Sequence, residues 1–390
     1  MQNFDYRTPT RLIFGRDVLR QLPDVLRPLG TKILLAYGGG SIKKTGLYDQ
    51  ILALLSGFEV AELSGIAPNP RYDPSVLDGV RICKERGIQA ILAVGGGSVL
   101  DCSKAIAAGA LHDGDPWDLI TGKIPVRAAL PVVSVMTMAA TGSEYDAAAV
   151  ISRAETDDKV CLIAPPLFPV ASFVDPALTF TVPRRQMVAG VADAFDHVLE
   201  QYFNADPNDL ADGMMESVMR SLAKNVRRAL ADPADYSARA EISLACALAC
   251  NGILSLGEAE SGWPMHALEH ALSAFYDITH GEGLAILAPR WMRHILSDRT
   301  APRLARYGVA VLGVSPALPD REAAEEAIAR TYDFFASLGI PMHLRDVGID
   351  DSRLPEMARH VAENEGYLSS PHCYVPLSES DILSIFRASL

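Results

Sequence analysis

Residues 32–41 read KILLAYGGGS: a mostly apolar stretch of strand character that runs directly into three glycines and a serine. The same layout returns at residues 88–98, IQAILAVGGGS. Helical character follows each copy, at residues 45–55 and 98–110. Such a strand, glycine turn and helix is typical of nucleotide-binding α/β domains, because backbone N–H groups at the turn can approach a phosphate closely.

Further strands and helices alternate around these two copies. Residues 58–63 and 130–136 have strand character, and residues 74–86 predict a helix after the loop Ala67-Pro68-Asn69-Pro70. Strands that alternate with helices predict a parallel sheet covered on both faces. We therefore expect an α/β domain in the first part of the chain.

The second half predicts helices instead, since its apolar residues recur at helical spacing and strand-like runs are nearly absent. The helical segments are 184–203, 208–230, 234–256, 264–274, 283–295, 321–338, 354–363 and 381–389. A chain of 390 residues is long enough for two domains. We predict an α/β nucleotide-binding domain over residues 1–180 and an all-helical domain over residues 181–390.

Composition argues against several kinds of partner. The chain has 35 basic and 48 acidic residues, a formal net charge of −13, and no basic run, whereas nucleic acids and anionic membranes attract clustered Lys and Arg. The N-terminal residues do not have the pattern of a signal peptide, and no apolar run reaches membrane-spanning length. The six cysteines form no disulfide-like framework. Free thiols fit a reducing compartment, so we expect a cytoplasmic protein.

The two glycine loops are candidates for binding phosphate, although tight turns alone would also explain them. Neither matches G-x-G-x-x-G, because Lys43 and Leu100 occupy the place of the last glycine. The candidate residues are Gly38, Gly39, Gly40, Ser41, Gly95, Gly96, Gly97 and Ser98. Asp101 and Lys104 share one face of the helix after the second loop. They form either a surface ion pair or a functional pair, with Asp101 near a cofactor ribose and Lys104 near the substrate.

Metal-binding side chains gather in the helical half. Asp193 and His197 are spaced i, i+4, as are His266 and His270, so each pair lies on one face of a helix, and His280 follows. One carboxylate and three imidazoles would suit a divalent iron or zinc ion with a position open to a substrate oxygen. For any single histidine, the alternative is a hydrogen-bonded place in the core.

The charges near these residues favour a neutral substrate. No Lys or Arg occurs in residues 186–219 or 240–289, which contain every candidate ligand. A phosphorylated or multiply carboxylated substrate is normally bound by basic side chains.

At this point the chain resembles the iron-containing (group III) alcohol dehydrogenases, and within them the branch of butanol dehydrogenases and broad-specificity aldehyde reductases. The resemblance covers nearly the whole chain and rests on YGGGSIKK at 37–44, GGGS at 95–98 with Asp101 and Lys104, TGSE at 141–144, Asp175-Pro176, DAFDH at 193–197, His266, His270 and His280-Gly281. It implies a dehydroquinate-synthase-like fold, in which an N-terminal Rossmann-like nucleotide-binding domain precedes a C-terminal helical metal-binding domain.

The resemblance also implies residue roles. The metal ligands would be Asp193, His197, His266 and His280. His270 would be an active-site histidine near the nicotinamide that does not bind the metal, and it joins Asp101 as a catalytic candidate. Thr137 and Thr141 would lie along the cofactor together with the glycine loops, Lys43, Asp101 and Lys104.

The implied activity is hydride transfer between a nicotinamide cofactor and a small primary alcohol or aldehyde, in a homodimer. A metal ion in such an enzyme polarises the substrate oxygen, and His270 or the ribose hydroxyls are the candidates for relaying the proton. Three alternatives stay open: a non-redox, dehydroquinate-synthase-like lyase on the same fold; a polyol (glycerol or diol) dehydrogenase that uses NAD; and a nucleotide-binding protein with a structural metal.

We further predict that NADP(H) is preferred over NAD(H). NAD-selective sites place an acidic residue near the end of a strand, where it binds the ribose 2′-hydroxyl and would repel a 2′-phosphate. The first glycine loop contains no acid, while Ser41, Lys43 and Lys44 can donate to phosphate oxygens. The resemblance points the same way.

Overall fold

The computed structural model describes residues 1–259, 261–371 and 373–390. The described chain forms two compact units, which we call the sheet unit and the helical unit. The sheet unit comprises Arg7–Pro183 and Asp232–Asn251, and the helical unit comprises Met1–Tyr6, Arg184–Ala231 and Gly252–Leu390. The predicted boundary between residues 180 and 181 lies close to the crossing at Pro183, but one segment of the second half, 232–251, clusters with the first.

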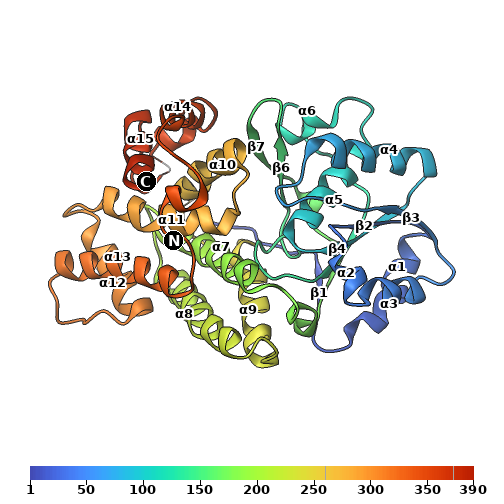
Figure 1. The fold of residues 1–390 in the computed structure, drawn as a ribbon, viewed down its shortest axis with the longest axis horizontal. Helices are drawn as coiled ribbons and strands as arrows, with labels where there is room; N and C mark the ends of the chain where they lie inside the picture. Colours follow the sequence, from blue (N-terminus) through green and yellow to red (C-terminus); the bar gives the residue numbers. More distant parts are fainter. Residues whose placement is uncertain (260, 372) are drawn as a thin grey trace. The chain divides into compact units, whose positions relative to one another are not determined.

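The sheet unit is built on a six-stranded parallel sheet in the order β1-β8-β5-β4-β2-β3. Figure 1 labels β1, β2, β3 and β4 of this sheet. Its strands are β1 (Arg11–Phe14), β2 (Lys32–Tyr37), β3 (Glu59–Leu63), β4 (Ala90–Gly95), β5 (Val132–Met136) and β8 (Ala171–Val174). A separate antiparallel hairpin pairs β6 (Ala148–Arg153) with β7 (Asp158–Ile163). The four strands expected from the sequence, β2 to β5, are all present.

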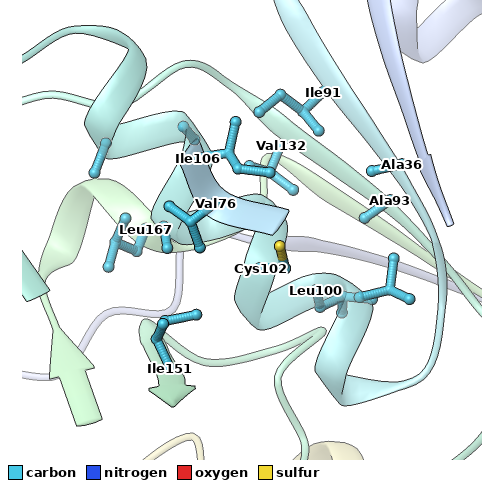
Figure 2. Close-up of a cluster of buried hydrophobic side chains, with 14 of the residues drawn as sticks. Ala36, Val76, Ile91, Ala93, Leu100, Cys102, Ile106, Val132, Ile151 and Leu167 are labelled. Atoms are coloured by element: carbon cyan, nitrogen blue, oxygen red, sulfur yellow. The ribbon is translucent and has the colours of Figure 1, made fainter. Parts of the chain in front are cut away.

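Helices cover both faces of this sheet. The helices of the sheet unit are α1 (Leu22–Leu26), α2 (Ser41–Lys44), α3 (Leu47–Leu54), α4 (Leu77–Arg86), α5 (Gly97–Ala110), α6 (Pro116–Ile120) and α9 (Tyr236–Ala249). Successive residues of a strand point to opposite faces, and Leu34 and Leu35 of β2 accordingly belong to two different apolar cores. The core with Leu35 is closed by α1 to α3, and the core with Leu34 by α4 and α5. Figure 2 shows part of the latter, with Leu100 and Ile106 of α5 near the sheet.

The two glycine loops leave the sheet from neighbouring strands. β2 and β4 are adjacent and parallel, with Tyr37 beside Val94, so both loops emerge at the same edge. The chain then continues into α2 and α3 on one face and into α5 on the other. Open α/β sheets bind their ligands at such a topological switch point.

The helical unit has no strand among its described residues. Its helices are α7 (Arg184–Tyr202), α8 (Asp209–Ala231), α10 (Pro264–Tyr276), α11 (His280–Ile295), α12 (Ala301–Leu312), α13 (Asp320–Ser337), α14 (Leu354–Asn364) and α15 (Glu379–Ala388). α7 is buried from Met187 to its end and packs against α8, α10 and α11. None of the helices in the described ranges is long and apolar enough to cross a membrane.

The helix predictions need correction at one helix that is too long and at four that were not predicted, namely α12 and the short α1, α2 and α6. The helix expected at 234–256 runs only from Tyr236 to Ala249, because the backbone leaves the helical region at Cys250, where φ is −124°, and the positive φ of 85° at Gly252 then prevents the helix from resuming. The helix α12 was not predicted at all, although it begins with a proline in its first turn, as many helices do.

Candidate metal centre and nucleotide site

Three helices of the helical unit bring together the four expected ligands. Asp193 and His197 lie one turn apart in α7, His266 lies in the first turn of α10, and His280 begins α11. Oδ1 of Asp193 lies 3.5 Å from Nε2 of His197, 3.9 Å from Nε2 of His266 and 3.6 Å from Nε2 of His280. Three imidazole nitrogens therefore converge on one carboxylate oxygen.

A glycine makes this convergence possible. A Cβ atom added to Gly281 would overlap the carbonyl oxygen of Ala189 in α7. Only glycine therefore lets α11 begin directly against α7, and this close approach brings His280 beside Asp193.

The separations fit a divalent metal ion. Ligand atoms around a tetrahedral ion with bonds of about 2.1 Å lie about 3.4 Å apart. The ligand atoms of Asp193, His266 and His280 lie within 4.8 Å of one another. His197 is not part of that group, but its Nε2 lies 3.5 Å from Oδ1 of Asp193 and its ring stacks on that of His266 at 4.6 Å. Nε2 of His266 is buried and has no hydrogen-bond partner among the described residues. A buried polar atom of this kind costs free energy unless an ion or a water binds it, so the residues present fit the metal.

Burial and neighbouring charges shift the pKa values of the cluster in both directions. Burial, and then the neighbouring His266 and His280, hold the pKa of His197 well below its ordinary value, and the neutral imidazole is the form that binds metals. Burial also acts to lower the pKa of His266, but the Glu200 carboxylate outweighs it and the pKa is raised. Burial, then the charges of Glu200 and Asp193, raise the pKa of Asp196 well above its usual range.

Two buried glutamates that the sequence analysis did not consider contact the outer nitrogens of the ligand rings. Nδ1 of His266 donates a hydrogen bond to Glu200 of α7, and Nδ1 of His280 donates one to Glu269 of α10. Both glutamate side chains are fully buried. Helical spacing offered a signal, because Glu200 lies two turns after Asp193 on the same face, and Glu269 lies on the same face as His266.

His270 lies next to the ligand set. Its ring centroid is 6.2 Å from that of His266 and 5.7 Å from that of His280. It is also more exposed than His266, and its ligand-capable atoms group with those of Glu269 and His280. The structure thus places His270 beside the cluster, and its part in the reaction stays a prediction.

In the sheet unit, the second glycine loop packs against the segment expected to line the cofactor. A Cβ atom on Gly97 would overlap the side chain of Thr141, and the N–H of Thr137 donates to the carbonyl of Gly95 at 3.0 Å. At Gly39, in the first loop, a Cβ atom would meet nothing within 4 Å. The first loop therefore has room beside its backbone for a ligand.

Lys104 neither forms a surface ion pair with Asp101 nor is available to a substrate, so neither expectation for it holds. Its side chain is fully buried, and Nζ donates to Oδ1 of Asp146 at 2.8 Å, to the carbonyl of Asp146 at 3.0 Å and to that of Ala148 at 2.7 Å. An ammonium group has three protons to donate, so none is left for a substrate or cofactor. Lys104 instead ties α5 to the segment before β6.

Asp101 is buried as well. Its Oδ1 accepts a hydrogen bond from the Ser143 hydroxyl at 2.7 Å, and its Oδ2 accepts one from the N–H of Val150 at 3.1 Å. Burial raises the pKa of Asp101 to about 6. The carboxylate thus holds the 143–150 segment in place, and a ribose hydroxyl would have to share one of its oxygens.

Glu62, an acidic residue that was not among the candidates from the sequence, lies near the first loop. Glu62 of β3 accepts hydrogen bonds from the Tyr37 and Tyr48 hydroxyls at 2.7 Å each. Nζ of Lys43 lies 5.1 Å from the Tyr37 ring centroid and 4.6 Å from that of Tyr48. Burial acts to raise the pKa of Glu62, but the hydrogen bonds from the two tyrosines and the charge of Lys43 outweigh it and lower the pKa. The Glu62 charge is therefore already compensated by its own neighbours.

A carboxylate with three imidazoles on buried helices, and paired glycine loops on a parallel sheet, are features of metal-dependent enzymes that use a nucleotide cofactor. The chain belongs to the iron-containing alcohol dehydrogenase family. Residues 9–176 match the family description "Iron-containing alcohol dehydrogenase", and residues 187–390 match the C-terminal region of the same family.

Known relatives resemble the chain over its full length. It is 43% identical over 392 residues to the NADH-dependent butanol dehydrogenase A of Clostridium acetobutylicum, with 100% of both chains covered. It is 38% identical to the NADPH-dependent aldehyde reductase YqhD of Escherichia coli, covering 93% of this chain and 94% of that one. The crystal structure of NADH-dependent butanol dehydrogenase A from Thermotoga maritima matches with a TM-score of 0.94 at 35% identity, covering 100% and 99% of the two chains.

The predicted dehydroquinate-synthase-like fold is thus confirmed, and the chain is an alcohol or aldehyde oxidoreductase. The names of the relatives divide between NADH and NADPH, so they leave the choice of cofactor open.

Proposed function

We propose that this protein interconverts small neutral aldehydes and primary alcohols with NADP(H), at a divalent iron or zinc ion held by Asp193, His197, His266 and His280. The observation that carries the proposal is the convergence of three imidazole Nε2 atoms on Oδ1 of Asp193. When bound, the ion would polarise the substrate oxygen, and the nicotinamide would exchange a hydride with the substrate carbon.

The charges around the cluster support a neutral substrate. The buried carboxylates of Glu200 and Glu269 add negative charge there, and the flanking sequences 186–219 and 240–289 contain no Lys or Arg. A phosphorylated substrate would meet repulsion without a basic partner. This arrangement supports an aldehyde reductase over a dehydroquinate-synthase-like lyase. It does not discriminate against a polyol, because a polyol is also uncharged.

The test of this function is steady cofactor consumption. We expect the protein to oxidise NADPH with propanal and butanal faster than it reduces NADP⁺ with 1,3-propanediol or glycerol. Treatment with a chelator should stop turnover, and added Fe²⁺ or Zn²⁺ should restore it, with metal content measured on the same sample. Activity confined to the polyols would favour the polyol dehydrogenase, and no turnover with any substrate would contradict the proposal.

His270 is proposed as the proton relay, because it lies beside the ligand rings and is more exposed to solvent than His266. The variant His270→Ala is expected to retain its metal but to lose kcat by about 10²-fold, the usual size of a general acid–base contribution, with a changed pH profile. Metal analysis and pH–rate profiles check this. Loss of the metal would instead make His270 a ligand.

The proposal includes a homodimer in the cytoplasm. The dimer is carried over from the family resemblance, and light scattering behind a sizing column tests it. The structure pairs none of the six cysteines in a disulfide bond, and four of them are buried, namely Cys83, Cys102, Cys246 and Cys373. Cysteines without disulfide bonds are typical of reducing compartments.

A further inference from the structure

We propose that Glu269 and Glu200 are positioning residues that set the affinity and the geometry of the metal centre, and that Ser273 in turn fixes Glu269. Neither glutamate belongs to the group of Asp193, His266 and His280 that would hold the metal. Each acts through the outer nitrogen of one ligand ring. This inference rests on the metal centre proposed above.

Glu269 is held on both of its oxygens. The Ser273 hydroxyl, one turn further along α10, donates to Oε1, and Nδ1 of His280 donates to Oε2. Both Glu269 and Ser273 are fully buried. With both oxygens engaged, the carboxylate plane has little freedom to turn, so the direction of the His280 ring is fixed as well.

A glycine in α11 makes room for the contact between Glu269 and His280. A Cβ atom at Gly283, one turn after His280, would lie 2.8 Å from Cγ of Glu269. That distance is shorter than any comfortable carbon–carbon contact. The glycine therefore lets α11 pass close enough to α10 for Glu269 to reach the His280 ring.

The hydrogen bond determines which nitrogen faces the centre. A carboxylate accepts only, so Nδ1 of His280 carries the proton and Nε2 keeps its lone pair. That lone pair lies on the atom that is 3.6 Å from Oδ1 of Asp193. A carboxylate behind a ligand histidine also makes the imidazole a stronger electron donor to a metal.

Glu200 acts in the same way on His266 and has a second task. Its Oε2 accepts from Nδ1 of His266, while its Oε1 accepts from the N–H of Met265 at 2.5 Å. This backbone donor belongs to the first turn of α10, where a negative charge also stabilises the helix start. Substitution of Glu200 should therefore weaken both metal binding and folding, and Glu269 is the cleaner probe.

The experiment measures metal binding rather than activity. The dissociation constants of Zn²⁺ and Co²⁺ are obtained by competition with a chelator, and the visible spectrum of the Co²⁺ form reports ligand geometry. Glu269→Ala should bind about 100-fold more weakly, with a shifted Co²⁺ spectrum. Glu269→Gln should bind the metal only about tenfold more weakly than the unmodified protein, because its amide oxygen still accepts a hydrogen bond from Nδ1 of His280 but carries no charge.

A matched control is Glu258→Gln, which removes the charge of another buried glutamate of the helical unit, one that bonds to Asn204 and Asn208. It should bind Co²⁺ within about twofold of the unmodified protein, as expected for a substitution away from the ligands. Ser273→Ala keeps Glu269 but frees one of its oxygens, and should weaken binding by about fivefold. If Glu269→Ala does not fold, the affinities of Glu269→Gln and Ser273→Ala decide whether the positioning role holds.

The experiment distinguishes a failure of the proposed metal centre from a failure of the positioning role. If the unmodified protein binds neither metal in stoichiometric amount, the proposed metal centre is wrong. If it binds both, and the foldable Glu269 and Ser273 variants match it in affinity and Co²⁺ spectrum, the centre stands and the positioning role is overturned.

Discussion

Replacing His266 with alanine should abolish aldehyde reduction and leave the protein without its metal. His266 contributes one of three Nε2 atoms around Asp193, and its ring stacks on that of His197, so its loss opens the cluster on one side. We expect kcat/KM to fall by at least about 10³-fold, which corresponds to the several kcal/mol that a Lewis acid supplies. His280→Ala should behave in the same way. Metal analysis and aldehyde-dependent NADPH oxidation on the same preparations check both variants.

The matched control is His294→Ala, which removes another imidazole from α11. His294 lies near the other end of that helix, with Nε2 3.3 Å from Oδ1 of Asp381. This variant should keep full metal content and turnover. Full metal occupancy and activity in His266→Ala or His280→Ala would show that the ligand set is wrong.

The sequence predicted those features of the two sites whose residues lie close together along the chain. The strand and the glycines that follow it are contiguous, so both loops could be found at residues 32–41 and 88–98, and the parallel pairing of β2 with β4 brings them together. The spacing of Asp193 and His197 within one helix likewise gave their shared face. By contrast, β1 and β8 have four residues each, too few for a periodicity to show.

Contacts between distant parts of the chain could not be predicted in this way. Lys104 pairs with Asp146, 42 residues away, rather than with its helical neighbour Asp101. His266 bonds to Glu200, 66 residues away, and Tyr37 to Glu62, 25 residues away. Spacing along a helix shows which residues share a face, but the residues that meet this face are set by tertiary packing. Every correction at the two sites is of this kind.

The choice of cofactor depends on two opposing charges at the first glycine loop. Lys43 supplies positive charge, as the sequence suggested, but Glu62 stands on β3, next to the strand that precedes the loop. An acid about 20 residues after a glycine loop is the usual partner of the NAD ribose. Here each Glu62 oxygen already accepts a tyrosine hydroxyl, so a ribose hydroxyl would have to share one of these oxygens. We therefore expect Lys43 and the open backbone at Gly39 to prevail and NADPH to be preferred.

Gly39→Asp should reverse that preference. A side chain fits at this position, because a Cβ atom would meet nothing within 4 Å and Gly39 is not among the glycines with positive φ. The new carboxylate would repel a 2′-phosphate by about 2–3 kcal/mol at an effective dielectric constant near that of a protein surface. We expect kcat/KM with NADPH to fall about 100-fold while that with NADH changes by less than about threefold.

Gly39→Asn is the control, since it has the same shape without the charge and should leave the NADPH to NADH ratio close to that of the unmodified protein. Glu62→Gln should act in the opposite direction and raise the ratio by a few-fold, because it removes a negative charge near Lys43. The measurement is kcat/KM for both cofactors with one aldehyde. Equal values or a preference for NADH in the unmodified protein would refute the NADPH proposal. A rise in NADPH use in Glu62→Gln would then identify Glu62 as the residue that selects NADH.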